Sequence, residues 1–304
     1  MREVGKIWMN GKLVPFKDAK VHVFTHALHY STAVFEGIRC YKTPKGSAIF
    51  RLPEHVVRLF NSAKMYDMKI PYTKKQITDA IIKTVKASTL KECYIRPIAY
   101  YGYGKLGLTP IENKVDAAIG CWEWKMGESK AGKFSGAKCK ISSWIRIDST
   151  AQPMKSKAAS NYANAALARV EALKEGYDEA IMLNSQGKIA EGSAENIFTV
   201  KDGQIRTPPL SADVLEGITR DSVIKIIEEN GGEVIQENID RDDLYVADEV
   251  FMTGTAAEVK SVTKIDQATI GTGKIGQITK ELQKAFTNVT MGRDDRFLSW
   301  LKYI

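Results

Sequence analysis

Two short motifs in this sequence could bind a phosphate group or a metal ion. Residues 102–107 (GYGKLG) match the GxGxxG pattern of dinucleotide-binding loops and follow a predicted strand. A dinucleotide loop must also open a helix whose N-terminus meets the pyrophosphate. Here Leu108-Thr109-Pro110 follows, with no amphipathic helix behind it. We therefore expect a mobile loop rather than a nucleotide site.

The second motif is a group of three histidines. His22, His26 and His29 are spaced i, i+4 and i+7. On a helix this spacing would align three imidazoles, as in some zinc sites. A neutral or hydrogen-bonded structural histidine is the commoner state, so we expect no metal here.

Five longer patterns are more specific than these two motifs. The second of them places lysines before small residues at the start of a predicted helix. The patterns are, in chain order, 34–39 (VFEGIR), 153–162 (PMKSKAASNY), 190–196 (AEGSAEN), 215–220 (LEGITR) and 251–258 (FMTGTAAE).

Together, and in this order, the five patterns resemble the branched-chain amino acid aminotransferases of the pyridoxal-phosphate fold-type IV group, the class IV aminotransferases. The resemblance runs from about residue 7 to residue 286. It implies an α+β fold with a smaller N-terminal α/β domain and a larger C-terminal pseudo-barrel domain. It also implies pyridoxal 5'-phosphate as the cofactor.

The resemblance identifies Lys157 as the catalytic lysine. An aminotransferase needs a lysine amine to hold the cofactor's aldehyde as a Schiff base and to shuttle a proton between the substrate Cα and the cofactor. Lys155 is the local competitor, but it would point to the opposite side of an extended segment. The small residues after Lys157 leave room for a ring, which favours Lys157.

The resemblance assigns further residues to the cofactor. Glu191 matches the acid that keeps the pyridine nitrogen protonated, and Glu195 is its competitor four residues on. The phosphate would be held at a helix N-terminus, where backbone N–H groups and the helix dipole favour anions. The remaining cofactor residues implied are Arg58, Thr219, Ile218 and Thr255 at the phosphate, Gly217 before the helix, Leu215 on a ring face and Tyr162 at the phenolic oxygen.

The substrate pocket must accept both an apolar branched chain and the distal carboxylate of glutamate. The resemblance implies an apolar wall with polar groups at its rim. The implied wall residues are Phe35, Trp124 and Tyr162, and the implied polar groups are Tyr30, Arg39, Tyr94 for the α-carboxylate, Arg96 for the distal carboxylate and the backbone of Thr255 and Ala256.

The resemblance also implies an oligomer. Leu106 and Leu108 match positions that reach the neighbouring subunit's pocket. A dimer would then be the smallest active unit, and the sequence leaves open a larger assembly such as a hexamer. The chain departs from the family pattern at Lys125-Met126-Gly127, where many members keep a tyrosine near the pocket. The departure affects side-chain selection and not the reaction.

Apolar periodicity and turn residues outline the elements that must position these residues. Strands and helices mix without a regular βαβ alternation, so an α+β fold is favoured. We expect a small domain at 1–125, a glycine-rich linker at 126–136 and a large domain at 137–304. The expected elements are a hairpin at 7–14, helices at 54–66, 74–90, 160–175, 219–230 and 276–288, and strands at 48–52, 92–101, 115–124, 140–147, 178–183, 188–191, 196–200 and 249–253.

Composition limits the other classes of function. The chain has 304 residues, 44% hydrophobic and 26% charged, as in an ordinary globular protein. We expect a cytoplasmic protein, since there is no apolar signal core and no membrane-spanning run, and the four cysteines are scattered as reduced thiols. The net charge of +8 comes from dispersed basic and acidic residues, so we expect no nucleic-acid binding.

Three hypotheses of function remain. The first is transamination between branched-chain L-amino acids (leucine, isoleucine, valine) and 2-oxoglutarate. The second keeps fold and cofactor but changes the reaction to that of a D-amino-acid aminotransferase or an aminodeoxychorismate lyase. The third is a basic nucleic-acid-binding protein. The pattern at 34–39 and Tyr94-Ile95-Arg96 favour the first.

Overall fold

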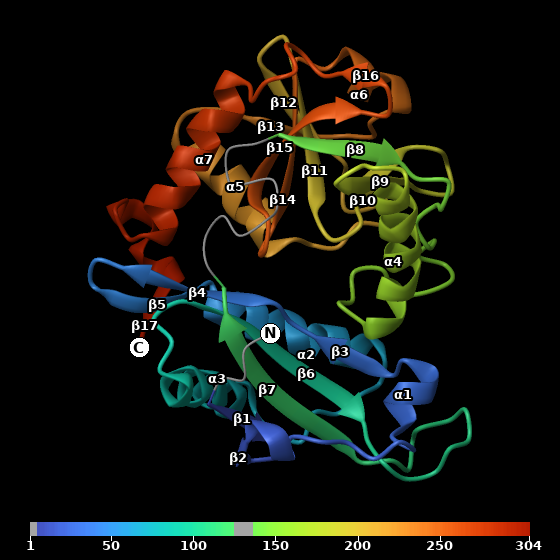
Figure 1. Ribbon diagram of the computed structural model, residues 1–304, viewed down its shortest axis with the longest axis vertical. Coiled ribbons are helices and arrows are strands. Elements are labelled where there is room, and N and C mark those ends of the chain that lie inside the picture. Colours follow the sequence, from blue (N-terminus) through green and yellow to red (C-terminus); the bar gives the residue numbers. More distant parts are fainter. Residues whose placement is uncertain (1–4, 125–135) are drawn as a thin grey trace. The chain divides into compact units, whose positions relative to one another are not determined.

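The computed structural model describes residues 5–124 and 136–304, and the chain divides into two compact units (Figure 1). The first unit comprises Met1–Lys125, Ser156–Ser160 and Val289–Ile304, and the second comprises Met126–Lys155 and Asn161–Asn288. The expected linker lies outside the described residues except for Gly136.

Two segments of the expected 137–304 domain belong instead to the first unit. The backbone of Lys157 bonds to Phe35, and Leu301–Tyr303 pairs with Gly46–Phe50. These long-range backbone bonds attach both segments to the first unit, so each unit is built from more than one stretch of the chain.

An eight-stranded antiparallel sheet forms the centre of the first unit. Its strand order is β17-β5-β4-β6-β7-β1-β2, and β3 pairs with β6. The Asn10-Gly11 turn of the β1–β2 hairpin has positive φ at both residues, as the sequence predicts. The strands are β1 (Lys6–Met9), β2 (Lys12–Pro15), β3 (Ala33–Phe35), β4 (Ile38–Thr43), β5 (Gly46–Phe50), β6 (Cys93–Tyr101), β7 (Val115–Glu123) and β17 (Leu301–Tyr303).

Two long helices pack against this sheet. They are α2 (Leu52–Met65) and α3 (Lys74–Ser88), and a short helix, α1 (His26–Tyr30), lies beside β6. A capping box in which Thr73 and Gln76 bond reciprocally starts α3. Val56 and Leu59 of α2 and Ile77 and Ile81 of α3 enter the same buried apolar cluster as the strands. Two 3-10 turns, η1 (Phe16–Asp18) and η2 (Asp295–Trp300), complete the unit.

A nine-stranded mixed sheet forms the second unit. Its order is β10-β9-β8-β15-β14-β11-β12-β13, with β16 on β15. The sheet curls on itself. Four strands separate β10 from β11 in the sheet order, yet these two strands also contact each other. The expected α+β class with a pseudo-barrel is therefore confirmed. The strands are β8 (Ala137–Ile141), β9 (Glu179–Leu183), β10 (Ile189–Gly192), β11 (Asn196–Lys201), β12 (Gln204–Thr207), β13 (Val234–Gln236), β14 (Glu249–Gly254), β15 (Glu258–Ile265) and β16 (Ala268–Thr269).

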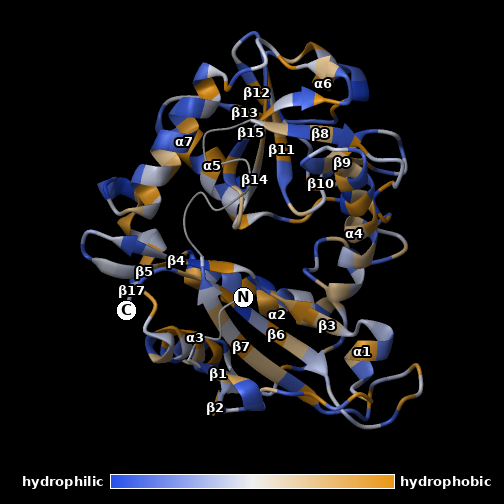
Figure 2. Ribbon diagram, viewed as in Figure 1, coloured by the Kyte–Doolittle hydropathy of each residue, from blue (hydrophilic) through white to orange (hydrophobic). Residues whose placement is uncertain are grey.

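The helices of the second unit are α4 (Ala159–Lys174), α5 (Ile218–Glu229), α6 (Arg241–Val246) and α7 (Gln277–Thr290), of which α4 and α7 each have two terminal residues in the first unit. Figure 2 shows α7 as an amphipathic helix. Its buried apolar residues Leu282, Phe286 and Val289 recur at i, i+4 and i+7. Within the described ranges, none of the helices has the length and apolar character needed to cross a membrane.

Most predicted elements are confirmed, but the strand expected at 140–147 is wrong. The strand β8 ends at Ile141 because the following polar residues turn the chain. The hydroxyl of Ser142 accepts a hydrogen bond from Trp144 N, and Ser143 N donates to Glu171. The apolar residues Trp144 and Ile145 are exposed instead of entering the sheet.

Candidate active site

The backbone of Lys157 is fixed on both sides by the first unit. Its N–H donates to Ser62 Oγ of α2 at 2.9 Å, and its carbonyl accepts from Phe35 N at 3.0 Å. The half-buried side chain places Nζ 5.2 Å from the centre of the Phe35 ring. The competitor Lys155 is exposed, and its Nζ lies 4.0 Å from Glu216. The two lysines thus have different environments, as their alternation in the sequence predicts.

Arg58 is held by a buried carboxylate that sequence reasoning gave no role. Arg58 Nε donates to Glu36 Oε1 at 2.7 Å, and Nη2 donates to Glu36 Oε2 at 2.9 Å. His55 Nδ1 lies 2.7 Å from the same Oε2. Burial lowers the pKa of His55, although Glu36 opposes this effect, so His55 is neutral at pH 7 and donates its Nδ1 proton.

Five of the predicted substrate residues of the first unit form one group that includes Arg96. Its guanidinium carbon lies 4.8 Å from the Phe35 ring centre and 5.5 Å from that of Tyr94. Trp124 packs on Tyr94 with ring centres 5.4 Å apart. The guanidinium carbon of the buried Arg39 lies 6.0 Å from the centre of the Trp124 ring. The structure therefore brings all five together.

Trp122 belongs to this aromatic group and was missed. It stacks on Tyr94 at 4.8 Å and lies 5.6 Å from the Arg96 guanidinium. Its position two residues before Trp124 was the available signal, because residues i and i+2 share a face of a strand. Gly37 is also constrained, since a Cβ there would clash with Tyr94 Oη.

The 102–107 segment forms a loop with no helix after it, as predicted from the sequence. Tyr30 OH donates to Leu106 O at 3.0 Å, so these two predicted residues lie together. His26 Nε2 lies 2.9 Å from Gly107 O. Leu108 stands apart, with 77% of its surface exposed.

The three histidines of the candidate metal motif have separate hydrogen bonds. His26 Nδ1 bonds to Thr32, His29 Nε2 bonds to Val23 O, and His22 Nδ1 accepts from Phe24 N. Across the described part of the chain, no group of three or more His, Cys, Asp or Glu residues is arranged to hold a metal ion.

Glu191 is a buried acid in the second unit. Arg146 Nη2 lies 2.6 Å from Glu191 Oε1, and Asn196 Nδ2 donates to Oε2 at 3.0 Å. Leu215 N also donates to Oε2. The competitor Glu195 is less buried and accepts from Ala194 N. The sequence did not reveal the roles of Arg146 and Asn196.

The helix N-terminus predicted to bind phosphate is present in the second unit. Helix α5 begins at Ile218 with Gly217 as its N-cap, so Ile218 and Thr219 occupy the first turn. Asn196 fills the space beside Gly217, where a Cβ would clash with the amide oxygen. Thr255 and Ala256 lie in the turn after β14, a strand against which α5 packs. Tyr162 is half-buried on α4.

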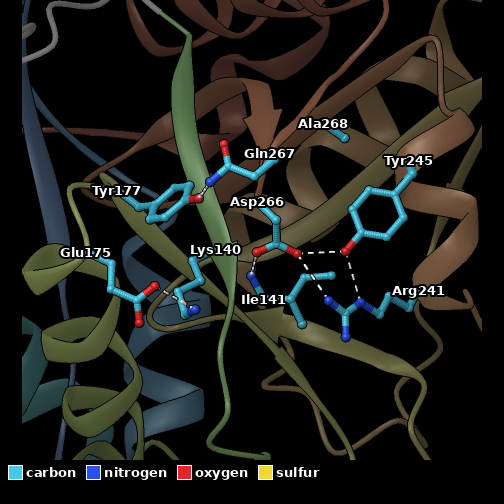
Figure 3. Close-up of a pocket in the computed structure, with 9 residues that line it drawn as sticks. All are labelled: Lys140, Ile141, Glu175, Tyr177, Arg241, Tyr245, Asp266, Gln267 and Ala268. Atoms are coloured by element: carbon cyan, nitrogen blue, oxygen red, sulfur yellow. Dashed lines mark hydrogen bonds and ion pairs between the residues drawn. The ribbon is translucent and has the colours of Figure 1, made fainter.

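A separate cavity of about 520 Å³ opens on the second unit (Figure 3). Its charged groups bond to one another: Lys140 with Glu175, and Arg241 and Tyr245 with Asp266. None of the nine lining residues is a predicted site residue. The cavity therefore does not alter the assignment of the site.

Known proteins resemble this chain over most of its length. Residues 33–265 match the family model described as amino-transferase class IV. A branched-chain-amino-acid aminotransferase from Pseudomonas aeruginosa is 42% identical over 97% of this chain and 96% of its own length.

Solved structures of branched-chain amino acid aminotransferases resemble the fold. The structure of the Escherichia coli enzyme has a TM-score of 0.96 at 40% identity, and the alignment covers 98% of this chain and 99% of that structure. A structure of the T.th. enzyme with pyridoxamine 5'-phosphate has a TM-score of 0.97 at 45% identity, and the alignment covers 100% of this chain and 99% of that structure.

Fold and sequence thus define a class IV aminotransferase. Within that class, the chain belongs to the branched-chain amino acid aminotransferase family. The resemblance predicted from the five patterns is confirmed.

Proposed function

We propose that this chain transfers the amino group of leucine, isoleucine or valine to 2-oxoglutarate, giving branched-chain 2-oxo acids and L-glutamate. Pyridoxal 5'-phosphate is the cofactor. The observation that carries this proposal is the lysine at 157, whose backbone N–H and carbonyl are both fixed while its amine projects beside Phe35. Family membership gives the reaction class, and the names of the relatives support the branched-chain substrates.

The chemistry of the donor set fits this cofactor. When bound, pyridoxal phosphate supplies an aldehyde and an electron-withdrawing ring. The amine of Lys157 would hold the cofactor at its aldehyde carbon and, once displaced there by the substrate's amine, would carry the proton between the substrate Cα and cofactor C4′. Glu191 would stabilise the protonated ring nitrogen, for which its buried, hydrogen-bonded carboxylate is suited.

The phosphate and the faces of the ring have their own assigned residues. Ile218 and Thr219 offer N–H groups at the start of α5, and a helix N-terminus favours anions. The other assignments are Arg58 and Thr255 at the phosphate, Gly217 before the helix, Leu215 on the ring face and Tyr162 at the phenolic oxygen.

The substrate residues divide into an apolar wall and carboxylate-binding groups. Phe35, Trp124 and Tyr162 form the wall in this proposal. Tyr94 binds the α-carboxylate together with backbone N–H groups of Thr255 and Ala256. Arg96 binds the distal carboxylate of glutamate, and its place among aromatic rings lets one site accept both a charged and a branched apolar side chain. Arg39 and Tyr30 are assigned to the polar rim.

The active form in this proposal is at least a homodimer, with a hexamer as a larger alternative. Leu108, Ile111 and Tyr103 give the loop after β6 an exposed apolar surface that a second copy would cover. Leu106 and Leu108 then contribute to the neighbouring pocket, and Tyr30 fixes Leu106. Light scattering tests the assembly. Leu108→Asp should shift it toward the monomer, and an unchanged mass would contradict the role of this surface.

The cytoplasm is the proposed location. The four cysteines are buried free thiols, which suits a reducing compartment. Fractionation of cells that produce the full chain tests this placement.

An absorption spectrum of the purified protein before and after addition of L-leucine tests the function. We expect a visible band from the lysine-bound cofactor, which is replaced by the band of the aminated cofactor. Addition of 2-oxoglutarate should restore the first band and release L-glutamate. Formation of D-glutamate would instead support a D-amino-acid aminotransferase. A colourless protein that does not bind pyridoxal phosphate but binds DNA at physiological salt would contradict the proposal.

A further inference from the structure

Glu36 is a fully buried acid at the junction between β3 and β4. None of its side chain is exposed, and its backbone N–H donates to Pro97 O at 2.9 Å. Its two carboxylate oxygens accept from Arg58, His55 and the backbone N–H of Gly37. Burying an acid is costly unless it is paired and hydrogen-bonded. This carboxylate meets both requirements.

The charges around Glu36 keep it ionised. Burial alone would raise the pKa of its carboxyl, but the charge of Arg58 and the hydrogen bonds of Arg58 and His55 hold the pKa well below its usual range. His55 contributes as a neutral donor because burial lowers its pKa, and the positive charges of Arg58 and Lys157 lower that pKa further. The group therefore contains one fixed anion and one fixed cation.

The bidentate contact determines how Arg58 is oriented. A guanidinium has five N–H donors in a rigid plane, and Glu36 takes one from Nε and one from Nη2. Two parallel bonds fix both the position and the plane of the group. His55, Arg58 and Ser62 share one face of α2, because they are spaced i, i+3 and i+7. Ser62 on that face holds the backbone of Lys157.

We propose that Glu36 is a positioning residue for the cofactor's phosphate group and acts through Arg58. This inference rests on the proposed function, in which Arg58 binds the phosphate. Glu36 fixes the plane of the guanidinium, and His55 fixes the carboxylate from its other side. The face of α2 that presents Arg58 also anchors the lysine that binds the aldehyde end of the same molecule.

The sign of a charge change separates positioning from simple electrostatics. Glu36 is an anion near the assigned phosphate residue, so Glu36→Gln should tighten phosphate binding if charge alone mattered. If orientation matters more, Glu36→Gln should weaken it. Glu36→Asp keeps the charge but withdraws the carboxylate by one methylene, so only the positioning role predicts weaker binding from both variants.

The experiment titrates the full-length chain, depleted of cofactor, with pyridoxal phosphate and, separately, with pyridoxal. We expect each Glu36 variant to weaken the affinity for pyridoxal phosphate by roughly tenfold. The affinity for pyridoxal, which has no phosphate, should change by less than about twofold. Glu54→Gln is the matched control, because Glu54 pairs with Arg51 at the start of α2 and has no assigned role. It should leave both affinities unchanged.

Several outcomes would overturn the inference. Tighter binding of pyridoxal phosphate by Glu36→Gln would indicate that Glu36 acts only through its charge. Unchanged binding would indicate that Glu36 has no role at the phosphate. Equal weakening for both compounds would indicate a general structural role. If Glu36→Gln does not fold, Glu36→Asp decides by the same ratio of affinities. A wild-type chain that binds neither compound at Lys157 would contradict the proposed function itself, which is a distinguishable failure.

Discussion

Two buried arginine–glutamate pairs, one in each unit, differ in how far their arginine is enclosed. In the first unit the carboxylate of Glu36 is fully buried, while 12% of the Arg58 side chain is exposed. In the second unit both side chains are buried and both are anchored: Arg146 Nε donates to Asp213 O at 3.4 Å, and Glu191 Oε2 accepts from Asn196 Nδ2 and Leu215 N. The first pair therefore leaves its cation partly exposed, whereas the second pair encloses both charges.

The comparison teaches that a buried ion pair can leave one partner partly exposed or can enclose both partners. A buried charge needs a counter-charge, but the two partners share the remaining hydrogen bonds unequally. Glu36 takes extra donors from His55 and Gly37, which make it part of the framework behind Arg58. Arg146 is also tied to a main-chain oxygen, so it supports Glu191 together with Asn196 and Leu215.

The largest effect is expected from Lys157→Ala, which removes the amine of the reaction that both pairs are proposed to support. The variant should lose the visible band and more than about 10⁴-fold in turnover of L-leucine with 2-oxoglutarate, because bond formation and proton transfer both depend on this amine. Lys155→Ala is the control and should retain both. The reverse result would move the catalytic role to Lys155.

The next largest effect should come from Glu191→Gln, which removes the anion that the second pair presents. We expect a loss of order 10²-fold in turnover, since the ring nitrogen no longer has a carboxylate to keep it protonated. Steady-state kinetics with L-leucine measures it. Glu195→Gln should have little effect, and a larger loss in that variant would exchange the two assignments.

Arg146→Met tests whether the arginine is the framework in the second pair. Removing one partner of a buried pair leaves an uncompensated charge, so the free energy of unfolding should fall by about 3 kcal/mol. Urea unfolding measures it. The pair of Arg296 and Asp294, in which 43% of the arginine side chain is exposed, provides a control, and Arg296→Met should cost less than about 1 kcal/mol. Similar costs for both variants would contradict the distinction.

The smallest expected effect concerns the pH dependence of stability in the first pair. Folding lowers the pKa of His55 from 6.5 and that of Glu36 from 4.5, so the unfolded chain binds more protons in acid. The free energy of unfolding should therefore decrease as the pH drops below about 6.5, because of His55. It should decrease further below about pH 4.5, because of Glu36.

His55→Gln isolates the first of these contributions. It should reduce the slope of unfolding free energy against pH between 5 and 6.5 by up to about 1.4 kcal/mol per pH unit. Denaturant unfolding at several pH values measures the slope, and His22→Gln, which changes an exposed histidine, is the control. An unchanged slope in His55→Gln would contradict the burial effect.

The family and most elements of the fold could be predicted from the sequence because their signals are local. The turn at Asn10-Gly11, the helix start at Ile218 and the order of five motifs each lie within a few adjacent residues. The end of β8 was less predictable, because Ser142 and Ser143 bond to groups that come from other elements.

The supporting residues of the site could not be predicted in the same way. Glu36 stood within a motif, but its contact with Arg58 depends on how α2 packs against β3. Arg146 lies outside all five patterns and meets Glu191 only after β8 and β10 have joined β9. Such pairings depend on tertiary packing, whereas a motif made of adjacent residues can be read directly from the sequence.

The pairing of β17 with β5 has a consequence for synthesis of the chain. The strand that covers the β5 edge of the first sheet is made long after β5 itself. During translation this edge presents unpaired backbone groups, which can attract strands of other nascent chains. The chain must therefore emerge from the ribosome as far as Tyr303 before the first sheet is complete, and slow synthesis would favour aggregation.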